Sequence, residues 1–412
     1  MANKKLYDQR KQRMIDVAQG RKPDRVPICA LMETYTLAYA GTTIDACNKS
    51  IKHHVQSYGK IYEDIYYDCA FTAYMTHSLE LGHGLGSDVF FASDDGISMQ
   101  HKEDCPMVQA DYDELIKNPI FWIFDNFLCR KFPKYDDTNE NQIKAFLGSL
   151  VPFAKFAGTM FYGSWYFKNK LDMPIVVGGS AEMPMDMIFD YLRGFRPTIN
   201  DMRRVPDKVE AAANALLDYC TDLTRMTNLM MGTNDGGLPW MIKNAVKAVI
   251  LRKDFEFTEF PWIFNPCHIP PFISPEQFER FYWPTYKYII EYVHSHGGHV
   301  LSVLEGEWGP NLELLKQLPD HSTTFVVEND DPKMVLDMFP NNSVMAGLPI
   351  ALLRDGTKEE CIAAAKKMID ECGPSGRFIF CTGNKVLLCP SDAVAENIRA
   401  VNEFVHGYGL YY

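Results

Sequence analysis

The chain has 412 residues, of which 47% are hydrophobic and 23% are charged, and its 41 basic and 53 acidic side chains give a formal charge of −12. This composition is typical of a packed globular protein, and the excess of acid argues against a protein that binds the phosphate backbone of a nucleic acid. No run of about 18 apolar residues occurs, and the opening MANKKLYDQRKQR has no apolar core, so we expect neither a membrane span nor a secretory signal. Eleven scattered cysteines without paired spacing favour reduced thiols, which predicts a cytoplasmic protein.

Short apolar runs recur along the chain and are separated by stretches long enough for amphipathic helices. The eight runs occupy residues 26–32, 88–92, 174–178, 260–264, 299–304, 323–327, 343–348 and 377–381. Strands that alternate with helices in this way predict βα units and a parallel sheet, and eight is the number of strands in a TIM barrel. We therefore predict an α/β fold with one domain over residues 1–412, a single (β/α)8 barrel.

Two helix starts and one irregular region complete the predicted arrangement. The sequence SPEQ at 274–277 is typical of a helix start, and TKEE at 357–360 predicts a helix that runs to Cys372 and ends at Gly373. The region from 106 to 171 contains the aromatic clusters FWIF and FYGSWYF. We interpret it as a helical and aromatic insertion after the second strand that covers one mouth of the barrel, with aromatic side chains that pack mainly against the barrel wall.

Polar residues follow most of the predicted strands. In a parallel barrel the residues after the carboxyl ends of the strands meet at one mouth, where active sites are built. The candidates are Glu33 and Tyr35 after the first run, Asp94 after the second, Cys267 and His268 after the fourth, Glu305 and Glu307 after the fifth, Glu328 and Asp330 after the sixth, and Asn384 after the eighth. Because several carboxylates at one mouth repel each other, at least one should have a raised pKa and transfer a proton near neutrality, unless a cation is present.

A metal ion would relieve the same repulsion. His268, Glu305 and Cys381 offer one nitrogen, one oxygen and one sulfur, which is a conceivable zinc set with an open fourth position. However, no H-x-x-x-H, H-E-x-x-H or C-x-x-C spacing supports such a site, and a lone histidine after a strand is more often a hydrogen-bonding group. Zinc therefore stays an alternative to proton transfer by the side chains themselves.

Several collinear motifs carry a resemblance to a known family. They include RKPDRVP at 21–27, LGSD at 85–88, FISP at 272–275, FYWP at 281–284 and EGEW at 305–308. With these motifs the chain resembles the uroporphyrinogen decarboxylase superfamily, in particular its longer members grouped with corrinoid-dependent methyltransferases. The resemblance implies a (β/α)8 barrel with its active site at the C-terminal mouth, and either decarboxylation or methyl transfer as the activity.

Two departures from the family patterns bear on this choice. True uroporphyrinogen decarboxylases carry an Arg-Gln-Ala-Gly-Arg loop after the first strand, whereas this chain has METYT at 32–36, with an acid where the ligand would be anionic. Family members that methylate thiols bind zinc through His-x-Cys-Gly after the fifth strand, where this chain has Val303 and Glu305. The first difference argues against a porphyrinogen substrate, and the second removes the usual zinc ligands.

The resemblance therefore predicts a methyltransferase that moves a methyl group between a corrinoid (cobalamin), carried by a partner protein, and a small-molecule donor or acceptor. A homodimer is a further expectation of the resemblance. Glu305 and His268 would be catalytic, and the substrate would be bound or oriented by Glu33, Tyr35, Asp94, Glu307, Glu328, Asp330 and Asn384. The alternatives are a cofactor-free decarboxylase of a tetrapyrrole-like or other carboxylated substrate, and a noncatalytic protein that binds a corrinoid or tetrapyrrole.

Overall fold

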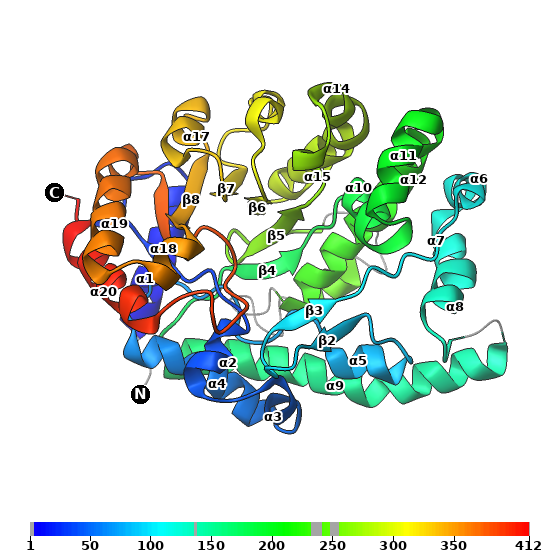
Figure 1. Cartoon of the computed structure of the whole chain (residues 1–412), viewed down its shortest axis with the longest axis horizontal. Coiled ribbons are helices and arrows are strands. Elements are labelled where there is room, and N and C mark those ends of the chain that lie inside the picture. Colours follow the sequence, from blue (N-terminus) through cyan, green and yellow to red (C-terminus); the bar gives the residue numbers. More distant parts are fainter. Residues whose placement is uncertain (1–3, 136–137, 232–240, 248–254, 412) are drawn as a thin grey trace.

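The centre of the protein is a curled parallel sheet. The computed structural model (Figure 1) describes residues 4–135, 138–231, 241–247 and 255–411. Within these ranges seven strands pair in the order β1-β9-β8-β7-β6-β5-β4, all in parallel. Their bounds are β1 Ile28–Cys29, β4 Val177–Ser180, β5 Trp262–Cys267, β6 Val300–Leu304, β7 Thr323–Val327, β8 Ser343–Leu348 and β9 Phe378–Gly383. From β4 to β9 the order along the chain is also the order in the sheet, as expected for consecutive βα units.

Residues 68–71 connect the two edges of this sheet. Cys69 forms an isolated parallel bridge with Cys29 of β1, and Ala70 forms another with Ile175, just before β4. The backbone N–H of Ala70 donates to the carbonyl of Pro174 at 2.9 Å, and that of Val176 donates to the carbonyl of Ala70 at 2.8 Å. The segment thus lies in the position that an eighth strand would take in a closed barrel.

The prediction that residues 88–92 form the second strand of this sheet is wrong. Phe90–Ala92 form β2, which pairs antiparallel with β3 (Met99–His101) in a separate two-stranded sheet. The run DVFFA has the aromatic and branched residues that favour strands, but β2 is only half-buried. Residues 69–71 are almost completely buried although their side chains are less typical of strands. The other seven predicted runs overlap strands of the parallel sheet, and 323–327 and 343–348 match their strands at both ends.

Helices surround the sheet and form most of the chain between residues 72 and 173 (Figure 1). Before β4 they are α1 Lys4–Ala18, α2 Tyr35–Ala40, α3 Ile44–Asn48, α4 Ile51–Asp64, α5 Leu79–Gly84, α6 Tyr112–Lys117, α7 Pro119–Trp122, α8 Leu128–Lys131 and α9 Asn139–Lys170. After β4 they are α10 Pro184–Asp186, α11 Phe195–Arg204, α12 Pro206–Met231, α14 Pro275–Gln277, α15 Trp283–Ser295, α16 Leu312–Leu315, α17 Pro332–Met338, α18 Ile350–Asp355, α19 Lys358–Cys372 and α20 Ala395–Tyr408. Both predicted helix starts are confirmed, because Ser274 and Thr357 form capping boxes with Gln277 and Glu360.

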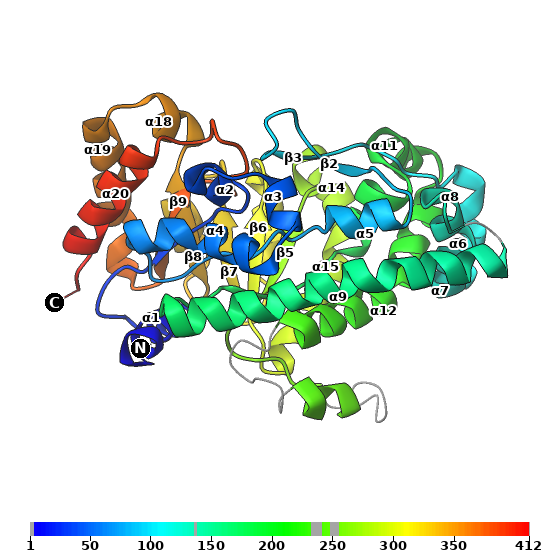
Figure 2. The same cartoon turned by 90° about the horizontal axis from the view of Figure 1, so that it is seen from below.

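The longest helix, α9, lies along one side of the molecule, where it runs beside α4, α5 and α12 (Figure 2). Its 32 residues span about 48 Å at 1.5 Å per residue. Phe167 near its carboxyl end is fully buried, and its ring centroid is 5.5 Å from that of Tyr62 in α4. Nearer its amino end, Phe146, Leu147 and Val151 are 60%, 56% and 76% exposed. No helix in the described ranges combines the length and hydropathy needed to cross a lipid bilayer.

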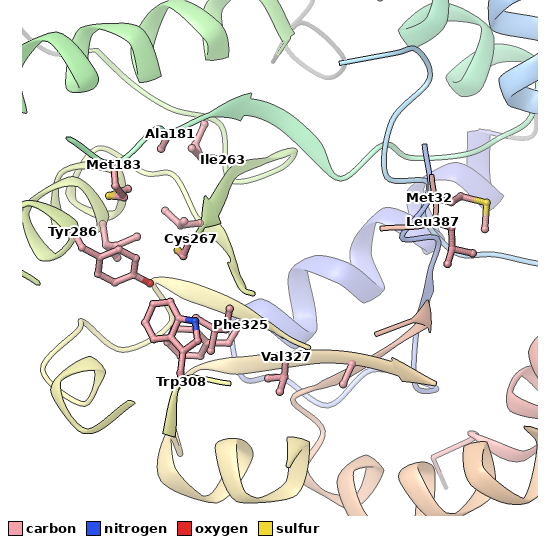
Figure 3. Close-up of a cluster of buried hydrophobic side chains, with 14 of the residues drawn as sticks. Met32, Ala181, Met183, Ile263, Cys267, Tyr286, Trp308, Phe325, Val327 and Leu387 are labelled. Atoms are coloured by element: carbon pink, nitrogen blue, oxygen red, sulfur yellow. The ribbon is translucent and has the colours of Figure 1, made fainter. Parts of the chain in front are cut away.

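Apolar side chains bury both faces of the sheet. One set, the inner cluster, takes at least one residue from each of the seven strands, from residues 69–71 and from α1, and therefore fills the concave side. Successive residues alternate between faces, as Leu301 belongs to the inner cluster and Val300 to the outer one. Figure 3 shows part of the outer cluster, where Tyr286 and Trp308 lie with ring centroids 6.4 Å apart. Because the inside of the sheet is packed, a ligand site must lie beyond the strand ends.

Candidate active site

His268 follows β5 directly and contacts two carboxylates. Its Nδ1 is 2.6 Å from Asp190 Oδ2, and its Nε2 is 3.1 Å from Glu305 Oε1. Burial lowers the pKa of His268, but the hydrogen bonds that it donates to these two carboxylates, together with their negative charges, outweigh burial and raise the pKa to about 12. The side chain is therefore an imidazolium near neutrality. It links the end of β5 to the loop after β6 and to η3 (Met187–Leu192), a π-helical turn that follows α10.

Asp186 holds the backbone around this histidine. Its side chain is fully buried, and Oδ1 accepts hydrogen bonds from the backbone N–H groups of His268 at 3.2 Å and Ile269 at 3.0 Å. Tyr282 donates its hydroxyl to Oδ2 at 2.6 Å. Burial raises the pKa of Asp186 well above its usual value, while the imidazolium of His268 lowers it. The role of this acid is to fix the position of His268 and not to meet a ligand.

Glu182 is a second buried acid near His268 with a raised pKa, and it differs from Asp186 in having an oxygen without a partner among the described residues. It lies two residues beyond β4, and burial raises its pKa to about 7, with an opposing effect of His268 and a supporting one of Asp190. Its Oε2 is buried and has no hydrogen-bond partner among the described residues. A carboxyl group in this state exchanges a proton readily at neutral pH. We refer to Glu182, Asp186, Asp190, His268 and Glu305 as the acid–histidine cluster.

The loop after β6, which carries Glu305, is held by acids from the end of β7. Glu328 Oε2 accepts a hydrogen bond from the backbone N–H of Gly306 at 2.6 Å, and Gly306 has a φ of +71° that disfavours other residues. Asp330 accepts from the backbone N–H groups of Trp308 and Gly309 at 2.8 and 3.1 Å. These acids therefore position the loop, and their predicted role in orienting the substrate stays a prediction.

Comparisons of the chain with family models and with solved structures show which proteins it resembles. Residues 259–408, which include β5 to β9, match the family model described as uroporphyrinogen decarboxylase (URO-D). The predicted resemblance to the uroporphyrinogen decarboxylase superfamily is confirmed. A methyltransferase from Methanosarcina mazei superposes with a TM-score of 0.62 at 12% sequence identity, over 97% of this chain and 98% of that chain, and at this identity it shows a shared fold. No curated protein matches the chain.

Glu33 and Tyr35, two residues predicted to bind the substrate, contact neighbouring loops of the protein. Glu33 is buried, and Thr76 donates its backbone N–H to Glu33 Oε1 at 2.8 Å. Burial raises the pKa of Glu33 to about 6, against the hydrogen bonds from Thr76. Tyr35 donates its hydroxyl to the carbonyl of Ala393 at 3.0 Å, and burial raises its pKa to about 12. Both residues tie β1 to neighbouring loops, and their role in substrate binding stays a prediction.

Three further candidates lie near the rim or outside it. Asn384 donates its amide to the carbonyl of Glu328 at 2.9 Å, which links the ends of β9 and β7. Glu307 is exposed to solvent. Asp94 is also exposed, in the turn between β2 and β3. Its assignment rested on residues 88–92 being a barrel strand, and that premise is wrong.

The residues present do not fit the zinc set of His268, Glu305 and Cys381. Both ring nitrogens of His268 contact carboxylates, so a metal ion could bind the ring only by displacing one of these contacts. Cys381 belongs to the inner cluster, and its thiol donates to the carbonyl of Gly383 at 3.2 Å. In the described part of the chain, no group of three or more His, Cys, Asp or Glu side chains is arranged to hold a metal ion.

The sequence reasoning missed three members of the cluster. Glu182, Asp186 and Asp190 all follow the third predicted strand, whose downstream polar residues were not among the candidates. A signal for them exists, because acids spaced four residues apart lie on one face of a helix. The same strand-end argument that selected His268 and Glu305 would have selected Glu182 if it had been applied to β4.

Proposed function

We propose that the protein is a methyltransferase that moves a methyl group between a corrinoid, carried by a partner protein, and a small-molecule donor or acceptor. The proposal is supported by the URO-D match, by the methyltransferase of similar fold and by the position of the acid–histidine cluster after β4, β5 and β6. In this proposal residues 68–71 complete an eight-stranded barrel. Cytoplasmic location and a homodimer stay predictions from the sequence.

The observation that carries the proposal is Glu182, with its pKa of about 7 and its unpaired Oε2, beside a fixed imidazolium. A methoxy or amine donor loses its methyl group slowly unless the leaving heteroatom is protonated, because an alkoxide or amide anion departs poorly. In the proposed step Glu182 donates a proton to this heteroatom, which keeps the electron pair of the broken carbon–heteroatom bond. The proton donor is thus Glu182, in place of the Glu305 or His268 suggested by the sequence.

His268 and Glu305 act as a charged pair in the same site. With a pKa of about 12, His268 does not lose its proton near neutrality, so it balances the charge of Asp190 and Glu305 throughout the reaction. The Glu305 side chain is 41% exposed, and it therefore presents a carboxylate edge to the mouth of the sheet. Both side chains keep the proposed catalytic assignment because they contact each other after β5 and β6 and their charges influence the proposed proton donor Glu182.

A corrinoid brought by a partner supplies the cobalt that accepts or donates the methyl group. The rim fits such a partner, because Glu305 and Glu307 are accessible from outside. A decarboxylase of a polycarboxylated substrate receives less support. Two carboxylates, Asp190 and Glu305, share the single positive charge of His268, so the cluster has no spare cation to bind several substrate carboxylates.

An absorbance assay tests the proposal. The purified chain is mixed with reduced cobalamin and a panel of methoxylated and methylated amine donors, and formation of methylcobalamin is followed. We expect methylation with at least one donor and a loss of about 100-fold in rate for Glu182→Gln. Glu403→Gln, an exposed acid on α20, serves as the matched control.

Two results would contradict this function. Release of carbon dioxide from a porphyrinogen without methyl transfer would identify a decarboxylase. A shift of the cobalamin spectrum that is unchanged by Glu182→Gln, with no product, would identify a noncatalytic binder.

A further inference from the structure

A cavity of about 420 Å³ lies beside the acid–histidine cluster, between η3 and the helical region that precedes β4. Residues 76–90, the segment around α8, α9, η3 and α12 contribute its walls. Most of the lining is apolar and includes the rings of Phe90, Phe127, Phe132 and Phe156. Its volume is within the range of pockets that hold small molecules. None of the residues assigned above to catalysis or orientation lines it.

The π-helical turn η3 separates this cavity from the cluster. Met187 and Tyr191 line the cavity, whereas Asp186 and Asp190 contact the histidine and its backbone. Met187 and Tyr191 are four residues apart, as are Asp186 and Asp190, and residues four apart lie on the same side of a helical turn. One side of the segment 186–191 therefore faces the cavity, and the neighbouring side faces the acid–histidine cluster. Burial raises the pKa of the Tyr191 hydroxyl above its usual range, and the charges of Glu182 and Asp190 add to this effect. Tyr191 therefore lines the cavity and is also close enough to Glu182 and Asp190 to respond to their charges.

Besides the hydroxyl groups of Thr76, Ser78, Ser87, Tyr191 and Tyr219, the polar side chains of the cavity are one imidazole and one ammonium. His77 is neutral, because burial lowers its pKa to about 4, and its ring stacks on Phe90 with centroids 4.3 Å apart. Lys131 is the single charged side chain among the described residues that line the cavity, and it is buried. Its ammonium donates to the carbonyl of Asp104 and lies 3.6 Å from Asp104 Oδ2. An ammonium has three N–H donors, and the hydrogen bond to the Asp104 carbonyl takes one of them.

We propose that this cavity binds a flat, apolar small molecule with one anionic group, whose negative end contacts Lys131. Phenyl rings on several walls favour an aromatic ligand, since edge-to-face contacts add to the burial of apolar area. An anionic group at a buried ammonium forms a charge-assisted hydrogen bond, which is stronger than a neutral one. That the bound molecule is also the substrate rests on the proposed methyltransferase function, whereas the binding itself does not.

Three naphthalene derivatives, one anionic, one neutral and one cationic, test the binding. The whole chain is titrated calorimetrically with 2-naphthoate, 2-naphthamide and 2-naphthylmethylammonium. We expect 2-naphthoate to bind about tenfold more tightly than the neutral amide, equivalent to about 1.4 kcal/mol, and the cation to bind most weakly. Equal affinity for the three probes, or preference for the cation, would overturn the proposal.

Variants locate the probe within the protein. Lys131→Met should remove the difference between acid and amide, Lys131→Arg should restore it, and Lys144→Met on the exposed side of α9 is the matched control. Leu85→Trp should fill the cavity and abolish binding of all three probes, with Val89→Phe as a second filling variant of smaller volume. Unchanged binding in folded filling variants would place the probe elsewhere and refute the cavity as the site.

The result is independent of the methyl-transfer assay. Binding that depends on Lys131, in a protein that methylates no cobalamin, keeps the pocket and rejects the proposed function. Methyl transfer in a protein whose filling variants bind and react normally rejects the pocket and keeps the function.

Discussion

Residues 259–408 and residues 72–173 bury apolar surface in different ways. The first region alternates β5 to β9 with helices, and each of these strands pairs in parallel with the next. The second contains only the short antiparallel strands β2 and β3 among its described elements and is otherwise helical, with large apolar side chains exposed on α9. The first region carries His268 and Glu305, and the second forms most of the cavity wall. The charged pair of His268 and Glu305 and the walls of the cavity thus come from different parts of the chain, and the proposed proton donor Glu182 lies in the sequence between these parts.

The largest expected effect contrasts one leucine from each region. Leu301 is fully buried in the inner cluster, and Leu147 on α9 is 56% exposed. Leu301→Ala should lower the free energy of unfolding by about 2–5 kcal/mol because it leaves a cavity, and Leu147→Ala should change it by less than about 0.5 kcal/mol. Denaturation with urea measures both. A comparable loss for the two variants would mean that α9 is covered in solution, and the contrast between the regions would fail.

A second test concerns the proton donor, with an effect of about 100-fold on rate. If Glu182 must be protonated to act, methyl transfer from a methoxy donor should decline as the pH rises through its pKa of about 7. Glu182→Gln should be slow at every pH and should lose this decline. A pH–rate profile of the two proteins decides the matter. A wild-type rate that increases through pH 7 would remove Glu182 from the role of acid.

The smallest expected effect concerns the contact that joins the helical region to the loop after β1, where Thr76 donates hydrogen bonds to Glu33. The folded protein raises the pKa of Glu33 from 4.5 to about 6, so its protonated form is favoured on folding. The stability that it contributes is present below about pH 4.5 and is lost as the pH rises through about 6. Relative to Glu33→Gln, the wild type should lose roughly 1–2 kcal/mol of unfolding free energy between about pH 4.5 and 7. Parallel curves for both proteins would contradict the buried acid.

The strands could be predicted from the sequence where burial and residue type agree. Residues 323–327 and 343–348 have branched or apolar side chains and lie inside the sheet. The prediction failed at residues 88–92, because their aromatic and branched side chains form a hairpin strand, whereas the small residues Cys69 and Ala70 lie between β1 and β4. Burial at that edge depends on the neighbouring β1 and β4, which a local pattern does not contain.

The site was predicted in part for a similar reason. The rule that residues after strand ends meet at one mouth selected Glu305 and His268, and the structure places these two side chains in contact. The same rule failed for Cys381, because side chains alternate between the faces of a strand and this thiol points into the inner cluster with Ile379. Asp190 lies beyond the turn that follows β4, and its distance of 2.6 Å from His268 depends on how η3 folds back. Such tertiary contacts are not encoded in spacing alone.

Residues 68–71 join β1 to the start of β4 through isolated bridges only, whereas the other strands of the sheet pair through longer ladders. Backbone hydrogen bonds that are not part of a long ladder open at a smaller free-energy cost than those in the middle of one. In deuterated solvent the amide of Ala70 should therefore exchange before that of Leu301, although both residues are buried. Local opening of the sheet should therefore begin between β1 and β4. Thr76, a few residues further along the chain, should move together with this segment.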